Sequence, residues 1–481
     1  MDDNMPEQFD TSVKNESRLA MGNIVGDLAM GYFGQFIEIP FSKDKTAMIN
    51  ETKRLINAET KIIAEASFAY EDNFCSVDIL RLVDGGYELV EVKSSTGSDT
   101  DEVDKIKSIY LHDMAYQVFV LTKCGVNIKK VSIMQLNRDY VRHGELDIQR
   151  LFVLTDCTDQ VFNMQNDILN NIADIKKYAE KQEEPMITIG SRCDAPYECG
   201  YKKWCFRNLP ENNVYDIGWG MWGSKKDAAY NAGFITFKDI LSGGVKLSEK
   251  QHRQVIASVN ELPPQIDRSA ISAFLSEIKY PLYHLDFETY QQAVPLWDSV
   301  SPYMQIPFQY SIHIQKEPYG NAIHKEFLGK EGIDPRHTLA ERLCADIPMG
   351  ACVLAYNMSF EKGIIKELAR LFPQLSEHLL NINENMIDLA TPFQSGAYYC
   401  RAMGGSYSIK SVLPAMCPND PELDYKTLTF IQNGEDAMNA YASLHEKAPK
   451  EVQEIRAALL AYCRLDTLAM VKVLEKLYGM I

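Results

Sequence analysis

The sequence has no long apolar run and comparatively little positive charge. No stretch approaches the roughly 20 apolar residues that cross a bilayer, and the start, MDDNMPEQFD, is not a secretory leader. The 49 Lys and Arg stand against 66 Asp and Glu, which gives a formal net charge of −17. We therefore expect a cytoplasmic protein without membrane contact that does not coat nucleic acid by bulk attraction.

The eleven cysteines do not form a pattern typical of disulfide frameworks. Their number is odd, and most stand singly in apolar stretches, as small buried residues do in a reducing cytoplasm. Cys193, Cys199 and Cys205 are the exception, because they follow one another at intervals of six. Thiolates held together suit zinc or an iron–sulfur cluster, and a plain structural cluster is the alternative.

The 481 residues exceed what one hydrophobic core usually supports. The paired prolines of ELPPQIDRS indicate a linker, after which the apolar strand PLYHLDF begins a new α/β unit. We expect an α/β protein with a first domain, a small helical connector and a second domain at residues 1–205, 206–268 and 269–481.

The connector is locally basic within an acidic chain. Residues 200–253 hold nine Lys and Arg against five Asp and Glu. With Gly220, Gly223 and Gly233, the segment loosely resembles a helix-hairpin-helix, whose turn backbone contacts phosphates. A helical spacer with solvated lysines accounts for the same pattern.

Four acidic residues in the second domain are predicted to share a site. Asp286 and Glu288 alternate along one predicted strand and therefore lie on one face of it. Glu361 stands in the first turn of an amphipathic helix, and a later helix carries Tyr462 and Asp466 four residues apart. Such a set of carboxylates suits two-metal phosphodiester hydrolysis.

The order Asp-x-Glu, Asn-x-x-Phe-Glu and Tyr-x-x-x-Asp resembles the DnaQ-like (RNase H-like) exonucleases. The resemblance covers roughly residues 280–475 and implies a mixed-sheet domain, 3′–5′ exonuclease activity and two Mg²⁺ or Mn²⁺ ions. It implies that a shared ion binds Asp286 and Glu288, a second ion binds Glu361 and Asp466, and Tyr462 positions the attacking water.

Two acidic positions qualify this resemblance. Glu361 stands where the superfamily usually has Asp, so its longer side chain requires a shifted backbone. Asp388, in MIDLATPF, is a further acidic residue that could join the same site.

A hairpin in the first domain carries a second candidate site. CSVDILRLV and YELVEVKSS flank Asp84-Gly85, a strong signal for a two-residue hairpin loop. This loop would put Asp78 opposite Glu91 and leave Lys93 on the same face. Two carboxylates can bind a metal while the lysine stabilises phosphate charge.

Asp…Glu-x-Lys on a hairpin resembles the PD-(D/E)XK (restriction-endonuclease-like) nucleases, specifically their RecB-like branch. Glu65 before the hairpin and Gln117 in the following helix fit that branch. Gly26 stands where the branch often has a histidine, so one metal ligand is missing.

The cysteines extend this resemblance to the CRISPR-associated RecB-like nucleases. These often carry a 4Fe–4S cluster on one leading and three trailing cysteines, and Cys193, Cys199 and Cys205 match the trailing three. The fourth, leading ligand is missing from this chain. The whole arrangement looks like an uncharacterised bacterial family that fuses such a nuclease to a DnaQ-like domain.

The sequence therefore predicts a metal-dependent nuclease that hydrolyses DNA or RNA, with single strands or ends as the favoured substrate. The alternative is a non-catalytic nucleic-acid-binding or scaffold protein in which one or both nuclease folds are degenerate. A third interpretation gives activity to the second domain alone.

Overall fold

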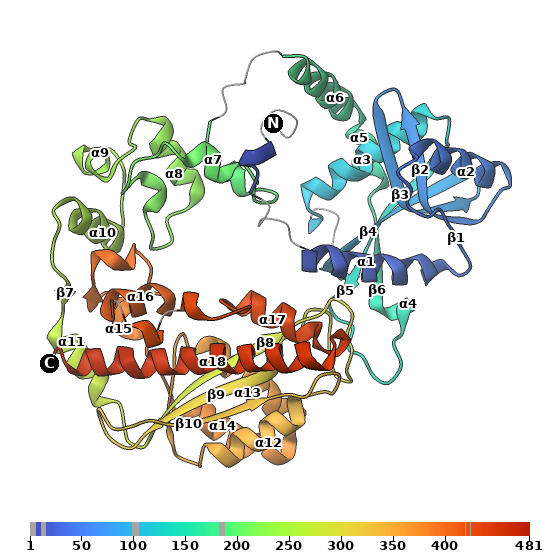
Figure 1. The fold of residues 1–481 in the computed structure, drawn as a ribbon. Helices are drawn as coiled ribbons and strands as arrows, with labels where there is room; N and C mark the ends of the chain where they lie inside the picture. The colour runs from blue at the N-terminus through green and yellow to red at the C-terminus, as the bar shows by residue number, and fades with distance from the viewer. Residues whose placement is uncertain (1–5, 11–15, 99–104, 182–187, 419, 424) are drawn as a thin grey trace. The chain divides into compact units, whose positions relative to one another are not determined.

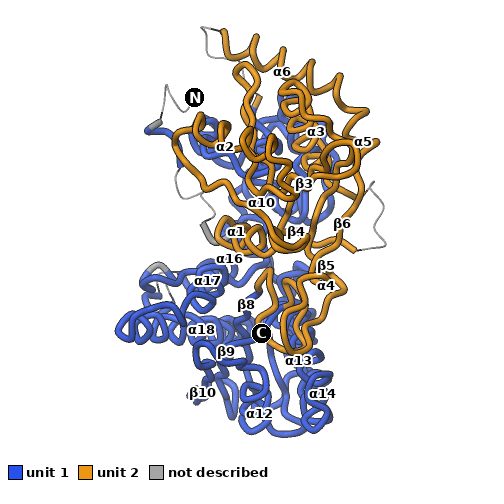
Figure 2. Tube along the Cα trace, turned by 90° about the vertical axis from the view of Figure 1, so that its right-hand side faces the viewer, with its two compact units in different colours: residues 1–13, 189–291, 305–481 blue, residues 14–188, 292–304 orange. Residues whose placement is uncertain are grey.

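The computed structural model describes residues 6–10, 16–98, 105–181, 188–418, 420–423 and 425–481 (Figure 1). The chain divides into two compact units (Figure 2). Unit 1 combines residues 1–13, 189–291 and 305–481, and unit 2 combines residues 14–188 and 292–304. Within the described ranges, no helix is both long enough and apolar enough to cross a membrane.

Unit 2 contains a mixed six-stranded sheet in the order β1-β2-β3-β4-β5-β6. Its strands are β1 (Ile37–Glu38), β2 (Ile62–Tyr70), β3 (Asn73–Val83), β4 (Gly86–Gly97), β5 (Ile128–Asn137) and β6 (Phe152–Asp156). Its helices are α1 (Glu16–Met30), α2 (Lys45–Asn57), α3 (Ser108–Lys123), α4 (Ile148–Leu151), α5 (Thr158–Asn163) and α6 (Gln165–Ala179).

The predicted hairpin register of β3 and β4 is confirmed. Val83 pairs with Gly86 across the two-residue loop, and the pairing continues without a slip to Ile79 and Val90. Gly86 suits this position because an added Cβ would lie 2.2 Å from the Asn127 carbonyl oxygen. Continued by one residue, this register places Asp78 opposite Glu91, as the loop length predicts.

Glu65 of β2 lies in the same region of the sheet. Ala64 pairs with Ile79 and Ala66 pairs with Val77, so the register passes through Glu65 without an extra residue and places it opposite Asp78. The φ of Glu65, 57°, is left-handed, which is uncommon for a residue with a side chain.

Unit 1 contains a mixed five-stranded sheet in the order β10-β9-β8-β11-β12, and β13 pairs with β7. The strands are β7 (Gln265–Ile266), β8 (Leu282–Tyr290), β9 (Ile306–Gln315), β10 (Ile323–Leu328), β11 (Cys352–Ala355), β12 (Met386–Asp388) and β13 (Tyr398–Tyr399). The helices are α7 (Lys202–Phe206), α8 (Gly223–Asn231), α9 (Phe237–Ser242), α10 (Glu249–Val259), α11 (Arg268–Ser276), α12 (Arg336–Asp346), α13 (Ser359–Leu371), α14 (Ser376–Glu384), α15 (Thr391–Ser395), α16 (Ile409–Met416), α17 (Gly434–Ala442) and α18 (Pro449–Tyr478).

The two faces of the unit 1 sheet differ in polarity. Tyr283, Leu285 and Phe287 of β8 join an apolar core shared with α12, α13 and α14. The opposite face is polar and lies under α18, which runs along the sheet (Figure 1). Across β8 and β9 this polar face carries His284, Asp286, Glu288, Gln309, Ser311 and His313.

Hydrogen bonds hold α18 on this polar face. The Thr467 hydroxyl lies 2.7 Å from the Ser311 hydroxyl and 2.8 Å from Nδ1 of His313. The side-chain amide of Gln309 donates to the Leu459 carbonyl over 2.9 Å. These bonds offset part of the cost of burying a polar strand face, although Oε1 of Gln309 and Nδ1 of His284 have no hydrogen-bond partner among the described residues.

The connector and the cysteine segment both belong to unit 1. Residues 206–268 contain α8, α9 and α10, and Val214, Phe237 and Val255 contribute to a small core of their own. Residues 189–205 were expected to close the first domain, whereas contacts group them with unit 1. Residues 292–304, from the expected second domain, group with unit 2.

Asp388 fixes the start of α13. Its carboxylate accepts backbone hydrogen bonds from Asn357 over 2.8 Å, Met358 over 3.2 Å and Ala390 over 2.9 Å. Asn357 turns the chain with a left-handed φ of 64° immediately before the helix. The sequence suggested Asp388 as a further site carboxylate, but these bonds give its oxygen atoms a structural role.

Replacing Asp388 by Ala should lower the free energy of unfolding of the protein by about 1–3 kcal/mol, because three backbone N–H groups lose their acceptor. Asp388→Asn keeps one acceptor oxygen and should lose less. Urea denaturation followed by circular dichroism measures both. Wild-type stability in the Ala variant would contradict this role.

Candidate metal centres

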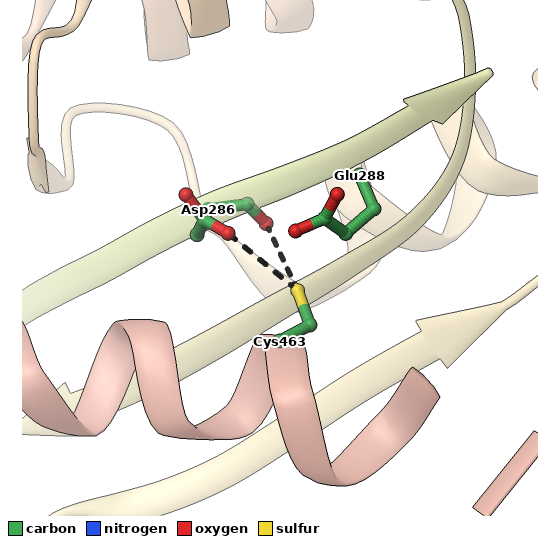
Figure 3. A group of neighbouring side chains, drawn as sticks. All are labelled: Asp286, Glu288 and Cys463. Atoms are coloured by element: carbon green, nitrogen blue, oxygen red, sulfur yellow. Dashed lines mark hydrogen bonds between the residues drawn. The ribbon is translucent and has the colours of Figure 1, made fainter. Parts of the chain in front are cut away.

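Two strand carboxylates and one helix thiol come together in unit 1. Asp286 and Glu288 extend from β8, and Cys463 extends from α18 toward them (Figure 3). One potential ligand atom from each residue lies within 4.8 Å of the others. Among the described residues, this is the one group of three or more such side chains that meets this distance.

Glu361 and Asp466 lie outside this group of three, but their negative charges act on its two carboxyl groups. Burial raises the pKa of Asp286 well above its ordinary value, and the negative charges of Asp466, Glu288 and Glu361 raise it further. Burial likewise raises the pKa of Glu288 to about 8, with Asp466 and Glu361 adding to the shift. The four predicted carboxylates thus form one electrostatically linked set, which we call the acidic cluster.

Glu361 contributes an oxygen that is ready for a ligand. The residue is only 3% exposed, and no described group hydrogen-bonds its Oε2. Burial raises its pKa to about 8, its own backbone N–H opposes the shift, and Asp388 adds to it. Since buried polar atoms are normally paired, such an oxygen suits a cation.

Two tyrosines surround Asp466. The Tyr425 hydroxyl donates to Oδ1 of Asp466 over 2.5 Å, and the ring centroid of Tyr462 lies 6.1 Å from that of Tyr425. Burial raises the pKa of Asp466 to about 6, although the Tyr425 bond and the charge of Lys410 oppose the shift. The sequence predicted Tyr462 as a site residue, whereas Tyr425 could not be found from a motif.

Lys410, near the start of α16, places a positive charge beside the acidic cluster. Its Nζ lies 5.5 Å from the ring centroid of Tyr462 and 5.6 Å from that of Tyr425. Its charge opposes the upward pKa shifts of Glu288 and Asp466. The side chain is exposed, so its ammonium group can also meet a ligand from solvent.

In unit 2 the structure brings together all four predicted residues of the hairpin site. Lys93 Nζ lies 2.6 Å from Oε1 of Glu91, and the Gln117 amide donates to Oε2 of Glu91 over 2.7 Å. Asp78 accepts a hydrogen bond from the backbone N–H of Val92 over 2.6 Å. The hairpin and helix α3 therefore converge at Glu91.

Asp113 is a further member that the sequence analysis missed. Its carboxylate lies 2.8 Å from Lys93 Nζ and 3.4 Å from the Gln117 amide nitrogen. Asp113 and Gln117 are four residues apart in DMAYQ, which places them on one face of α3. This spacing of four residues from Gln117 is the sequence feature from which Asp113 could have been predicted.

The positive charge of Lys93 offsets part of the negative charge of the carboxylates in the hairpin site. Burial raises the pKa of Glu91 to about 8, with the charge of Asp78 adding to the shift. Burial also raises the pKa of Asp78 to about 6, while its bond from Val92 opposes the shift. For Lys93 burial acts against the charge, but Glu91 and Asp113 outweigh it and raise the pKa.

Additional carboxylates lie near Gly26, the position at which the resemblance to the RecB-like branch implies a histidine. Burial raises the pKa of Glu65, and the charges of Glu38, Glu91 and Asp27 add to the shift. Asp27 directly follows Gly26 on α1. Helix α1 therefore still directs an acidic side chain toward this region.

The cysteine segment forms a tight turn. The Cys199 N–H donates to the Cys193 carbonyl over 2.8 Å, and the Asp10 N–H donates to the Gly200 carbonyl over 2.8 Å. Among the described residues, the three sulfur atoms of this segment are not all within 4.8 Å of one another, whereas one zinc ion would need thiolates about 4 Å apart. An iron–sulfur cluster spreads its thiolates over several irons, and it stays a prediction.

Comparisons with known proteins give family information but no activity. The profile described as "Domain of unknown function (DUF2779)" matches residues 283–408, which include Asp286, Glu288 and Glu361. The chain is similar to "Uncharacterized protein MG366" of Mycoplasma genitalium, with 23% identity over 404 residues. That alignment covers 74% of this chain and 58% of the relative. No solved structure matches.

Proposed function

We propose that this protein is a metal-dependent nuclease that hydrolyses phosphodiester bonds in DNA or RNA, with an exonuclease-type site at the acidic cluster. The observation that carries the proposal is the burial of four mutually repelling carboxylates from β8, α13 and α18. Divalent cations are the usual reason for holding such charges together.

The four carboxylates form two ligand pairs according to the elements that carry them. Asp286 and Glu288 share one strand face, while Glu361 and Asp466 approach from two helices. Mg²⁺ or Mn²⁺ bound there would activate a water and stabilise the leaving oxygen. Tyr462 would orient the attacking water, and Tyr425 would hold Asp466 in place through its short hydrogen bond.

The fold agrees with this proposal. A mixed sheet whose first long strand carries Asp-x-Glu, followed by a helix with Glu361 and a late helix with Asp466, is what the resemblance to DnaQ-like (RNase H-like) exonucleases implies. In unit 2, the hairpin, Gln117 and a mixed sheet agree with a PD-(D/E)XK nuclease of the RecB-like branch.

A binding role without cleavage is the second candidate for unit 2 alone. Lys93 lies within ion-pair distance of both Glu91 and Asp113, so part of the negative charge that a metal requires is already neutralised. In addition, Gly26 has no side chain to provide the metal ligand that a histidine of α1 would supply. We therefore assign the principal activity to unit 1.

Asp286→Asn should reduce Mn²⁺-dependent cleavage of labelled single strands by more than about 100-fold, the upper range for losing a residue that only supports a metal ligand. Asp78→Asn tests unit 2 in the same assay, on single and double strands. Asp174→Asn, the same change at an exposed position of α6, is the matched control.

Equal cleavage by wild type and Asp286→Asn would reject the unit 1 assignment. Loss in Asp78→Asn alone would move the activity to unit 2. Absence of cleavage by wild type on both DNA and RNA would favour the scaffold interpretation.

The raised pKa values predict a pH-dependent effect of metal on stability. A carboxyl whose folded pKa lies above its unfolded value stabilises the fold below about pH 4.5 and loses this contribution as pH rises through its folded pKa. Glu288 and Glu361, with pKa values near 8, should therefore weaken the metal-free protein between pH 5 and pH 8.

Mn²⁺ should reverse this loss at pH 8, by about 2.7 kcal/mol at one hundred times its Kd, and should have little effect at pH 5, where protons compete for the ligands. Thermal unfolding with Mn²⁺ or with EDTA measures the difference. Glu361→Gln should flatten the pH dependence of the metal-free protein. An equal Mn²⁺ effect at both pH values would contradict the argument.

Lys410 is predicted to contact substrate phosphate. Lys410→Gln should weaken single-strand binding and reduce the slope of log affinity against log salt by about 0.7. Fluorescence anisotropy in the Asp286→Asn background measures binding without cleavage. Lys250→Gln is the control, because Lys250 also lies over an aromatic ring, that of Trp219, at 5.4 Å. Equal slopes in both variants would remove Lys410 from the substrate site.

A further inference from the structure

Cys463 is the one member of the three-residue group that two-metal hydrolysis does not require. Its Sγ lies 3.7 Å from Oδ2 of Asp286 and 3.9 Å from the Asp286 backbone oxygen (Figure 3). Glu288 offers a second carboxylate oxygen within 4.8 Å. Cys463 is fully buried, so the thiol has these carboxylates as its polar surroundings.

The surroundings of Cys463 differ from those of other buried cysteines of unit 1. Cys352, Cys400 and Cys417 belong to an apolar core that packs with the C-terminal part of α18, where a small hydrophobic side chain is sufficient explanation. Cys463 instead faces Asp286 and stands on α18 between Tyr462 and Asp466. A weakly hydrogen-bonding thiol at this position is a poor partner for a carboxylate and a good ligand for a soft metal.

We propose that Cys463, Asp286 and Glu288 form a three-ligand site for a thiophilic divalent ion of the zinc class, which displaces the Mg²⁺ or Mn²⁺ of the acidic cluster and inhibits cleavage. The proposal rests on the proposed nuclease function. In binding, the thiol proton passes to solvent and the sulfur coordinates the ion, without any change of oxidation state.

The geometry suits a tetrahedral ion. Zinc–sulfur and zinc–oxygen distances of about 2.3 and 2.0 Å separate the two ligand atoms by roughly 3.5 Å. The distance from Sγ of Cys463 to Oδ2 of Asp286 is 3.7 Å, so this pair needs only a small movement, and the ligand oxygen of Glu288 lies within 4.8 Å of both atoms. Three protein ligands leave a fourth position for water or a phosphate oxygen.

Selectivity follows from ligand type. Mg²⁺ requires oxygen ligands in octahedral geometry, whereas a thiolate favours zinc, cobalt and cadmium. The same strand carboxylates would therefore serve a hard ion when the thiol stays protonated and a soft ion when it coordinates. Cleavage would then respond to the ratio of the two metals.

Cobalt titration of the full chain tests the site directly, since Co²⁺ replaces Zn²⁺ and a thiolate ligand gives a near-ultraviolet charge-transfer band. We expect the wild-type spectrum minus that of Cys463→Ser to contain this band, which removes the signal of the other cysteines. Asp286→Asn should lose the same component. Cys344→Ser, a change at a half-buried cysteine of α12, should retain it and should cleave normally.

Inhibition provides a second readout. Against the Mn²⁺-supported cleavage of each variant, Zn²⁺ should inhibit wild type and Cys344→Ser at concentrations at least about 10-fold lower than Cys463→Ser or Cys463→Ala. Circular dichroism establishes that both Cys463 variants fold.

The outcomes separate this inference from the proposed function. If wild type cleaves with Mn²⁺ but its cobalt spectrum equals that of Cys463→Ser, the thiol ligand is overturned and the nuclease proposal stands. If wild type neither cleaves nor binds Mn²⁺, both are overturned. A difference band with zinc inhibition that depends on Cys463 supports the inference.

Discussion

Repulsion among the buried carboxylates of the acidic cluster is the main electrostatic constraint on unit 1. Neighbouring histidines cannot relieve it, because burial lowers the pKa of His284 to about 4 and that of His313 to about 3, which keeps both neutral. The polar sheet face is held under α18 by bonds such as those of Thr467. A cation is the counter-charge that the proposed function would supply, while the apolar core on the other face of the sheet stabilises the fold.

In unit 2, a lysine of the chain itself provides the positive charge that offsets the repulsion among buried carboxylates. Lys93 lies between Glu91 and Asp113, and the chain thus carries its own counter-charge. A metal entering that group would compete with an ammonium ion, whereas Asp286 in the acidic cluster of unit 1 has Asp466, Glu288 and Glu361 as its charged neighbours. The two groups should therefore differ in metal dependence even though both resemble nuclease sites.

The sequence was sufficient to predict the features that local backbone geometry determines. Strand alternation placed Asp286 beside Glu288, and a two-residue loop fixed the register of the hairpin. Tyr425 and Lys410 could not be predicted, because they lie outside the motifs and approach Asp466 only through tertiary packing. The grouping of residues 292–304 with unit 2 is equally non-local, since nothing in their composition marks a change of unit.

Glu361 is one methylene longer than the Asp found at this position in the DnaQ-like exonucleases, and its place at the start of α13 accounts for the extra length. The backbone N–H groups of Asn357 and Met358 donate to Asp388 and fix where α13 begins. Glu361 therefore stands in the first turn, where free N–H groups stabilise a carboxylate. Its own backbone N–H stabilises the charged carboxylate, while Oε2 remains without a partner among the described residues. A longer side chain can turn back to its backbone and still present one oxygen to a cation, which the shorter Asp could not do from the same position. The departure from the usual Asp is thus compatible with metal binding.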